Sequence, residues 1–321
     1  AVLLVVGLML PAPPSREGTF PLTLVQPNLG QDRLHDASWY EANFVTLASL
    51  SLPRGDNAAR LVLWPESGLA DYLRDGYPWR FYDQTTAFAD PELARRRIGR
   101  VIGPRSMLLT GAVDLEIAQG RAVGAYNSVT AVAGDGAIRG GYSKAHLVPY
   151  GEYLPMRWLL EPLGFSRLVP GVIDFLPGGG PRTLSLGAQG KAGIQICYEI
   201  IFSGQVTDRA HRPDYIFNPS NDGGFGAFGP PQHLAQARMR AIEEGLPVLR
   251  STTTGISAVI DADGVVRAPV TIRLSERPAH RVSFGGGFSS NTGARVEANY
   301  QTPDLFTNAW DFNTGLRIEQ K

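Results

Sequence analysis

Short apolar runs alternate with segments of helical periodicity along most of the chain. Several of these runs are apolar at every position, which is typical of strands that are buried on both faces. The runs that we interpret as strands are Leu22–Gln26, Leu61–Trp64, Met107–Val113, Asn127–Val132, Gly193–Cys197, Asp214–Asn218, Val248–Ser251 and Ile256–Ile260.

Turn sequences and helical patterns separate the strands. Gly134-Asp-Gly136 and Asp263-Gly264 each divide two apolar runs, which predicts two hairpins. One helix is expected to begin at Ser38, where Glu41 completes a capping-box pattern. Two more are expected over Pro91–Ile102 and Pro231–Glu244. Helices combined with hairpins and buried strands favour a layered α/β sandwich over a purely parallel winding.

The two ends of the chain differ from its middle. Residues 1–10 are wholly apolar and Pro11 follows, but a membrane span needs about 20 such residues. We interpret residues 1–12 as the end of a transmembrane helix, the alternative being a buried strand or core segment. A catalytic domain is expected over residues 20–273. Residues 274–321 are expected to be loop or weak strand and form an unassigned tail, possibly non-native.

Composition narrows the classes of function. Lys and Arg together number 30, as do Asp and Glu, so the net charge is zero, and this argues against a nucleic-acid partner. Cys197 is the one cysteine, which excludes an intrachain disulfide and a cysteine-built metal site. The histidines are scattered, and the glycine pattern at 224–229 is followed by two prolines. We therefore expect no metal and no cofactor.

Three segments place reactive side chains beside predicted strands. Glu66 follows Trp64-Pro65 at the carboxyl end of a strand, where α/β folds commonly bind ligands. Lys144 follows a hairpin strand and precedes Glu152 by eight residues. Each of these could instead be an ordinary structural residue: an acid at a helix start, or a surface lysine and glutamate.

The third segment carries Cys197 and Glu199 after a buried run. A lone cysteine is commonly an inert core thiol. Burying Glu199 is costly without a partner, and a reactive thiol needs a base or a cation, which Glu66 and Lys144 could supply.

These motifs resemble the Glu–Lys–Cys triad of the nitrilase (carbon–nitrogen hydrolase) superfamily over about residues 21–270. Longer strings resemble one branch of it, the apolipoprotein N-acyltransferases. They are W-P-E at 64–66, K-x-H-L-V-P-x-G-E-Y-x-P at 144–155, C-Y-E at 197–199, S-N-D-x-x-F-G at 220–226, Gln232-His233, A-R-M-R-A-I-E at 237–243 and R-S-T-x-x-G at 250–255.

The resemblance implies a four-layer αββα sandwich. It also implies Glu66 as general base, Lys144 as oxyanion stabiliser and Cys197 as nucleophile, with Glu152, Tyr198 and Glu199 in supporting roles. The activity it implies is transfer of an acyl chain from a phospholipid, through a Cys thioester, to the N-terminal amine of a diacylglyceryl-cysteine apolipoprotein. The implied location is the bacterial inner membrane, with the catalytic domain facing the periplasm.

Two other classes of function remain open on the sequence. A soluble nitrilase-type amidase would use the same triad with water as acceptor, and would need no membrane tether. A non-catalytic scaffold would retain the fold without turnover.

Overall fold

The computed structural model describes residues 18, 20–53, 59–163, 174–269, 281–289, 293–305 and 310–319. The chain forms two compact units, residues 1–270 and 271–321. The predicted membrane-helix end at residues 1–12 lies outside the described residues. Within the described part of the chain, no helix has both the length and the apolar character needed to cross a bilayer.

The first sheet of the larger unit has the order β1-β2-β3-β4-β5. Its first three strands are parallel, and β3, β4 and β5 form an antiparallel meander. The bounds are Leu22–Leu24 for β1, Leu61–Leu63 for β2, Met107–Ala118 for β3, Arg121–Ala133 for β4 and Ile138–Ser143 for β5.

The second sheet has the order β11-β10-β9-β8-β7-β6. Strands β7, β8 and β9 are parallel at its centre, and antiparallel strands complete each edge. The bounds are Thr183–Ser185 for β6, Lys191–Ile194 for β7, Tyr215–Ser220 for β8, Val248–Thr252 for β9, Ala258–Ile260 for β10 and Val266–Pro269 for β11.

The two sheets pack face to face through a shared apolar core. Leu61 and Leu63 of β2 lie in one buried cluster with Phe217 of β8 and Leu249 of β9. Val62 alternates with these leucines and belongs to a different cluster, on the outer face of the first sheet. This period of two explains why the strand is apolar at every position, since both of its faces are buried.

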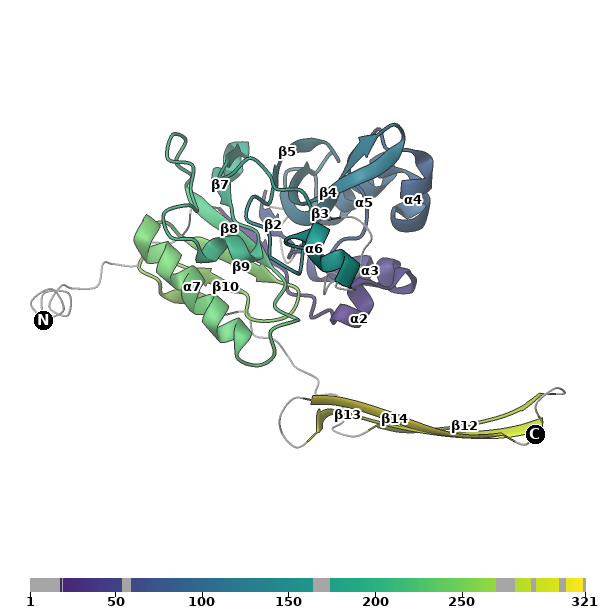
Figure 1. Cartoon of the computed structure of the whole chain (residues 1–321). Coiled ribbons are helices and arrows are strands. Elements are labelled where there is room, and N and C mark those ends of the chain that lie inside the picture. The colour runs from purple at the N-terminus through teal and green to yellow at the C-terminus, as the bar shows by residue number, and fades with distance from the viewer. Residues whose placement is uncertain are drawn as a thin grey trace, which may run out of the picture. The chain divides into compact units, whose positions relative to one another are not determined.

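Helices cover both outer faces. Helices α3 (Tyr40–Leu50) and α5 (Pro91–Ile102) supply Phe44 and Ile98 to the outer cluster of the first sheet. Helix α7 (Gly229–Glu244) packs Ala237 and Ala241 on the second sheet and lies along it in Figure 1. The layers are therefore helix, sheet, sheet, helix, and the predicted αββα sandwich is confirmed.

Short helical turns complete the larger unit. They are α2 (Gln31–Leu34), η1 (Ala37–Trp39), α4 (Trp79–Thr85), η2 (Ala87–Ala89), α6 (Arg157–Leu160), η3 (Glu161–Leu163), η4 (Gly187–Gln189) and η5 (Cys197–Ile201).

Two local predictions were wrong. The strand expected over Gly193–Cys197 ends at Ile194, and Cys197 begins the 3-10 turn η5 instead. The helix expected from Ser38 begins at Tyr40, because Asp36 accepts a hydrogen bond from the Ser38 amide (2.9 Å) and caps the separate turn η1. In both places a polar local motif ends or delays the regular element that the apolar pattern predicts.

The smaller unit is an antiparallel meander. Strands β12 (Arg281–Ser289), β13 (Gly293–Leu305) and β14 (Trp310–Glu319) pair in sequence order. The loop or weak strand expected here is thus replaced by strands of 9, 13 and 10 residues. Val282, Val296 and Leu316 are exposed on them.

Candidate active site

Glu66 lies just beyond the carboxyl end of β2, as the sequence predicts. Trp64 and Pro65 continue the chain past Leu63, and the Glu66 side chain is buried. Gly111 of β3 permits this close approach, because a Cβ atom at that position would lie 2.8 Å from the Glu66 Cα. Glycine is therefore needed where β3 passes the backbone of Pro65 and Glu66.

Lys144 follows β5 and its side chain is only 1% exposed. Its ammonium Nζ lies 3.0 Å from the Glu152 carboxylate and 3.7 Å from Glu66 Oε1. Burial opposes the charge of Lys144, but the two carboxylates outweigh it and raise the pKa of the ammonium above its ordinary value. The lysine therefore stays positively charged at the centre of the cluster.

Asn127 joins the two carboxylates, and the sequence interpretation missed this residue. Its Nδ2 donates to Glu66 Oε1 and to Glu152 Oε1, both at 2.7 Å. Its carbonyl also accepts the Lys144 amide at 2.8 Å. The signal available in the sequence was a polar residue in an apolar strand of the hairpin that ends at Lys144.

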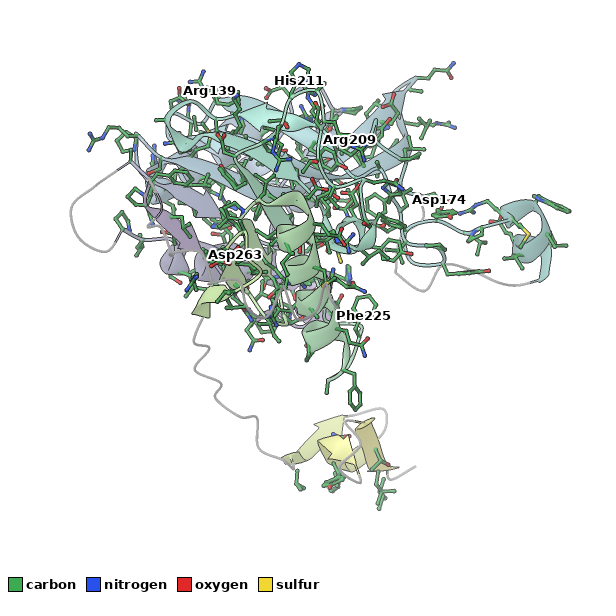
Figure 2. All side chains as sticks on the ribbon, turned by 90° about the vertical axis from the view of Figure 1, so that its left-hand side faces the viewer. Arg139, Asp174, Arg209, His211, Phe225 and Asp263 are labelled. Carbon is green, nitrogen blue, oxygen red and sulfur yellow. The ribbon has the colours of Figure 1, made fainter. Side chains whose placement is uncertain are left out.

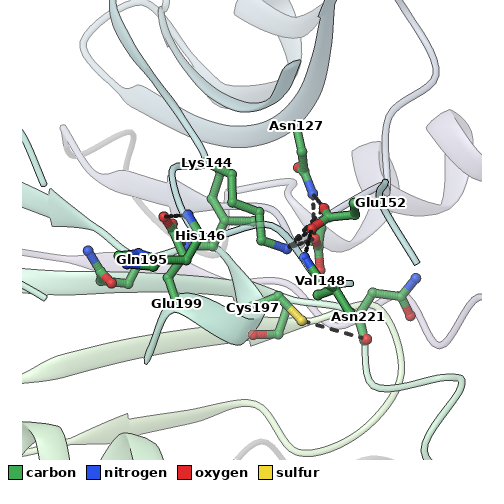
Figure 3. A network of polar contacts seen from close by, with 12 residues as sticks. Asn127, Lys144, His146, Val148, Glu152, Gln195, Cys197, Glu199 and Asn221 are labelled. Atoms are coloured by element: carbon green, nitrogen blue, oxygen red, sulfur yellow. Dashed lines mark hydrogen bonds and ion pairs between the residues drawn. The ribbon is translucent and has the colours of Figure 1, made fainter. Parts of the chain in front are cut away.

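Cys197 comes from the facing sheet, at the first position of η5. Its φ of 48° is left-handed, a conformation that costs a non-glycine residue on the order of 1 kcal/mol and that recurs at functional sites. The sulfur lies 4.0 Å from the Asn221 carbonyl (Figure 3).

The thiol is held in its protonated form. Burial raises the pKa of Cys197 above its ordinary value, the negative charge of Glu66 raises it further, and the Lys144 ammonium opposes both. A base is therefore needed at the moment when the sulfur reacts, and Glu66 is the carboxylate whose charge acts most strongly on it.

Glu199 has the partners that its burial requires. Its Oε1 accepts from the Tyr142 hydroxyl (2.7 Å) and from the Ala145 amide (2.7 Å). The same oxygen accepts from the His146 amide at 3.2 Å, and Oε2 accepts from the Ile196 amide at 2.8 Å. The carboxylate thus ties the segment after β5 to the turn that carries Cys197.

Tyr198 is placed differently from the other predicted residues. Its ring packs edge-on against Phe202, with the ring centroids 5.1 Å apart. Among the six predicted site residues, Glu66, Lys144 and Glu152 form one ionic cluster. The charges of Glu66 and Lys144 act on the Cys197 thiol. Glu199 joins the segment after β5 to the turn that carries Cys197. Figure 3 shows this network, with Lys144, Glu152, Cys197 and Glu199 labelled.

The fold and this buried arrangement define a class of α/β sandwich with a carboxylate, an ammonium and a thiol between two facing sheets. The chain belongs to the carbon-nitrogen hydrolase family, whose model matches residues 22–272.

Curated relatives indicate which members of this family the chain resembles. The chain is 40% identical over 252 residues to the apolipoprotein N-acyltransferase of Bradyrhizobium diazoefficiens, covering 76% of this chain and 44% of the relative. It is 38% identical over 256 residues to the one from Rhodopseudomonas palustris, covering 77% of this chain and 45% of that relative. The chain thus spans a little under half the length of these relatives.

Solved structures agree with the fold. A carbon-nitrogen hydrolase from Helicobacter pylori G27 matches with a TM-score of 0.51 at 17% identity, over 78% of this chain and 84% of that one. Saccharomyces cerevisiae Nit3, a member of branch 10 of the nitrilase superfamily, matches with a TM-score of 0.50 at 19% identity, over the same shares.

Proposed function

We propose that this chain is the catalytic domain of an apolipoprotein N-acyltransferase, with Cys197 as nucleophile, Glu66 as general base and Lys144 as oxyanion stabiliser. The observation that carries the proposal is the buried cluster in which Lys144 lies between Glu66 and Glu152, with the Cys197 turn joined to the Lys144 segment through Glu199. The relatives at 38–40% identity support acyl transfer over hydrolysis.

The first half-reaction forms a thioester. Glu66 accepts the thiol proton while the Cys197 sulfur bonds to the ester carbonyl carbon of a phospholipid. The negative charge that develops on the carbonyl oxygen lies by the Lys144 ammonium, and one such donor is typically worth about 3–4 kcal/mol. The ester C–O bond then breaks, and Glu66 returns the proton to the departing lysophospholipid oxygen.

The second half-reaction transfers the acyl group to an amine. The N-terminal amine of a diacylglyceryl-cysteine lipoprotein attacks the thioester carbon and gives a proton to Glu66. The new C–N bond forms, the C–S bond breaks, and the thiolate recovers a proton. Asn127, Glu152 and Glu199 hold the reacting groups in place, and Tyr198 packs beside the nucleophile.

Exposed apolar side chains near the site favour a lipid over a small polar amide. Tyr150 and Met156 lie on either side of Glu152 in sequence and are 45% and 55% exposed. Phe225 and Phe228 follow Asn221 and are 57% and 83% exposed. Figure 2 shows the Phe225 ring projecting away from the ribbon. Apolar side chains that form a contiguous exposed patch mark protein- or membrane-interaction surfaces.

Mass spectrometry tests the proposal directly. Incubation of the chain with phosphatidylethanolamine vesicles is expected to add one acyl chain to Cys197. A peptide that begins with S-diacylglyceryl-cysteine should then remove the adduct and gain the acyl group as an amide. Blocking the amine of that peptide is the matched control and should leave the adduct in place. Hydrolysis of small amides without a phospholipid-derived adduct would support the amidase alternative instead.

A further inference from the structure

A second buried polar cluster adjoins the nucleophile. Its members are Asp222, in the segment after β8, Arg250 of β9 and His233 of α7. Arg250 Nη2 donates to Asp222 Oδ2 at 2.7 Å and to Oδ1 at 3.0 Å, and both side chains are fully buried. None of the three has a role in the reaction proposed above.

His233 connects this cluster to the nucleophile. Its Nε2 lies 3.0 Å from the carbonyl oxygen of Cys197, and its Nδ1 lies 2.9 Å from Asp222 Oδ1. Asn218 Nδ2 approaches the same carbonyl less closely, at 3.5 Å. A peptide carbonyl can only accept hydrogen bonds, so Nε2 must carry a hydrogen to make its contact with Cys197.

The hydrogen on Nε2 is the one that the contact with the nucleophile requires. With hydrogen on Nδ1 alone, the lone pair of Nε2 faces that of the Cys197 carbonyl at 3.0 Å. Nδ1 lies 2.9 Å from Asp222 Oδ1 and 3.1 Å from Arg250 Nη2. Because Nη2 carries two hydrogens, Arg250 can donate to Nδ1 as well as to the Asp222 carboxylate, which leaves the Nε2 hydrogen for the Cys197 carbonyl.

A buried ion pair holds the Nδ1 side of the ring. Burial would raise the pKa of Asp222, but the His233 hydrogen bond and the Arg250 charge outweigh it and hold that pKa below its ordinary value. The carboxylate is therefore ionised beside the ring, where Arg250 pairs with it. From Gly229 to Ala237, the helix carries no other charged side chain near it.

His233 contacts the backbone at a residue in a strained conformation. The left-handed φ of Cys197 persists only where surrounding contacts determine it. The peptide unit that begins with the Cys197 carbonyl is planar and ends at the Tyr198 N–H. The N–H of the residue after a nucleophile is a common oxyanion donor, so fixing one end of this plane fixes the direction of the other.

We propose that His233 is a positioning residue for the nucleophile. The imidazole, held by the Asp222–Arg250 pair, donates its Nε2 hydrogen to the Cys197 carbonyl and fixes the Cys197–Tyr198 peptide in the orientation that reaction requires. This inference rests on the proposed function for its effect on rate, whereas the state of the ring can be measured without any substrate.

Nitrogen NMR of the ¹⁵N-labelled chain at neutral pH tests the ring. Nε2 of His233 should resonate as an N–H donor, and the His233→Gln variant identifies the signals by their loss. An unprotonated Nε2 in the parent chain would overturn the proposal, whatever the chain does to phospholipids.

Thioester formation on Cys197 tests the positioning. His233→Leu removes the donor and should slow acylation about 10- to 100-fold, the loss typical of a buried acceptor left without its donor. His233→Gln keeps an N–H near the Nε2 position and should recover most of that loss. His211→Gln is the matched control, because His211 is an exposed histidine that also faces an aspartate, Asp208 (Figure 2).

The outcomes separate this inference from the proposed function. Equal rates for His233→Leu and the parent would overturn the positioning role. Equal loss in His233→Leu and His233→Gln, with unchanged unfolding by urea, would show that the donated hydrogen bond is not what matters, and would also overturn it. If the parent itself forms no thioester, the proposed function fails, and the NMR result still decides the state of the ring.

Discussion

The two sheets hold their parts of the site in different ways. The first sheet places Glu66 and Lys144 by charge, because the ammonium lies between two carboxylates and Asn127 bridges them. The second sheet places Cys197 by backbone conformation, through a left-handed φ and contacts to the peptide groups around it. Changes on the first sheet should therefore alter proton and oxyanion chemistry, and changes on the second should alter geometry.

The largest expected effect is that of Cys197→Ala. Removing the sulfur leaves no atom to carry the acyl group, so acylation should fall by about 10⁴-fold or more, as for nucleophile removal in other covalent enzymes. The side chain is small and makes no strong hydrogen bond, so urea unfolding should change little. Mass spectrometry of the phospholipid-treated protein checks the first point, and an acyl adduct on the variant would contradict the thioester route.

Glu66→Gln should separate proton transfer from thiol ionisation. Loss of the base should slow acylation by about 10²- to 10⁴-fold. The charge of Glu66 raises the pKa of the thiol, so the same variant should lower that pKa and speed alkylation by iodoacetamide at a fixed alkaline pH. The exposed Glu116→Gln is the control. Slower alkylation in Glu66→Gln would show that its charge does not reach the sulfur.

Lys144→Met should act in the opposite direction on the thiol. Loss of the ammonium should slow acylation by about 10²- to 10³-fold, since one oxyanion donor is removed. Because this charge lowers the pKa of Cys197, alkylation should become slower. Two buried carboxylates lose their partner, so unfolding free energy should fall by about 3–5 kcal/mol. The exposed Lys191→Met is the control, and faster alkylation in Lys144→Met would contradict the charge arrangement.

Asn127→Ala should have a smaller effect on the same cluster. Its amide hydrogens bond both carboxylates, so its removal frees Glu66 to shift and should slow acylation about tenfold. The exposed Asn299→Ala is a matched control. Acylation at the parent rate would show that Lys144 alone is enough to position the carboxylates.

Phe228→Ala should have the smallest effect and should change neither the ionic cluster nor the Cys197 turn. The ring is 83% exposed, so stability should change by less than about 0.5 kcal/mol. If it contacts lipid, acylation at low vesicle concentration should slow by less than about tenfold and recover as vesicles are added. Phe88→Ala is the control, because Phe88 is also exposed and lies far from the site in sequence. No difference between the two variants would remove Phe228 from the lipid surface.

The sequence predicts the layered fold of the larger unit well. The apolar run Leu61–Trp64 is buried on both faces, and its length and end are enough to place Glu66 at the sheet edge. The strand at 193–197 was extended too far, because Glu199 accepts the Ile196 amide and turns the chain into η5. A pattern of apolar positions does not show this polar contact, although its partner is only three residues ahead.

The missed residues share one property, since their roles depend on contacts between distant segments. Asn127 is an ordinary polar residue in a strand until β4 and β5 pair and bring it beside Lys144. Asp222 meets Arg250 28 positions away and His233 11 positions away. Such contacts are set by tertiary packing, which neither spacing nor composition encodes.

Glu199 carries a consequence for any attempt to rebuild this site elsewhere. Its side chain links the two halves of the site. Oε1 accepts hydrogen bonds from Tyr142 and Ala145 at the end of the hairpin, and Oε2 accepts one from Ile196, which precedes the cysteine turn. The lysine-bearing and sulfur-bearing halves are thereby coupled through a single carboxylate. Grafting the cysteine turn onto another scaffold would therefore require Glu199, together with the hairpin end to which it is hydrogen-bonded.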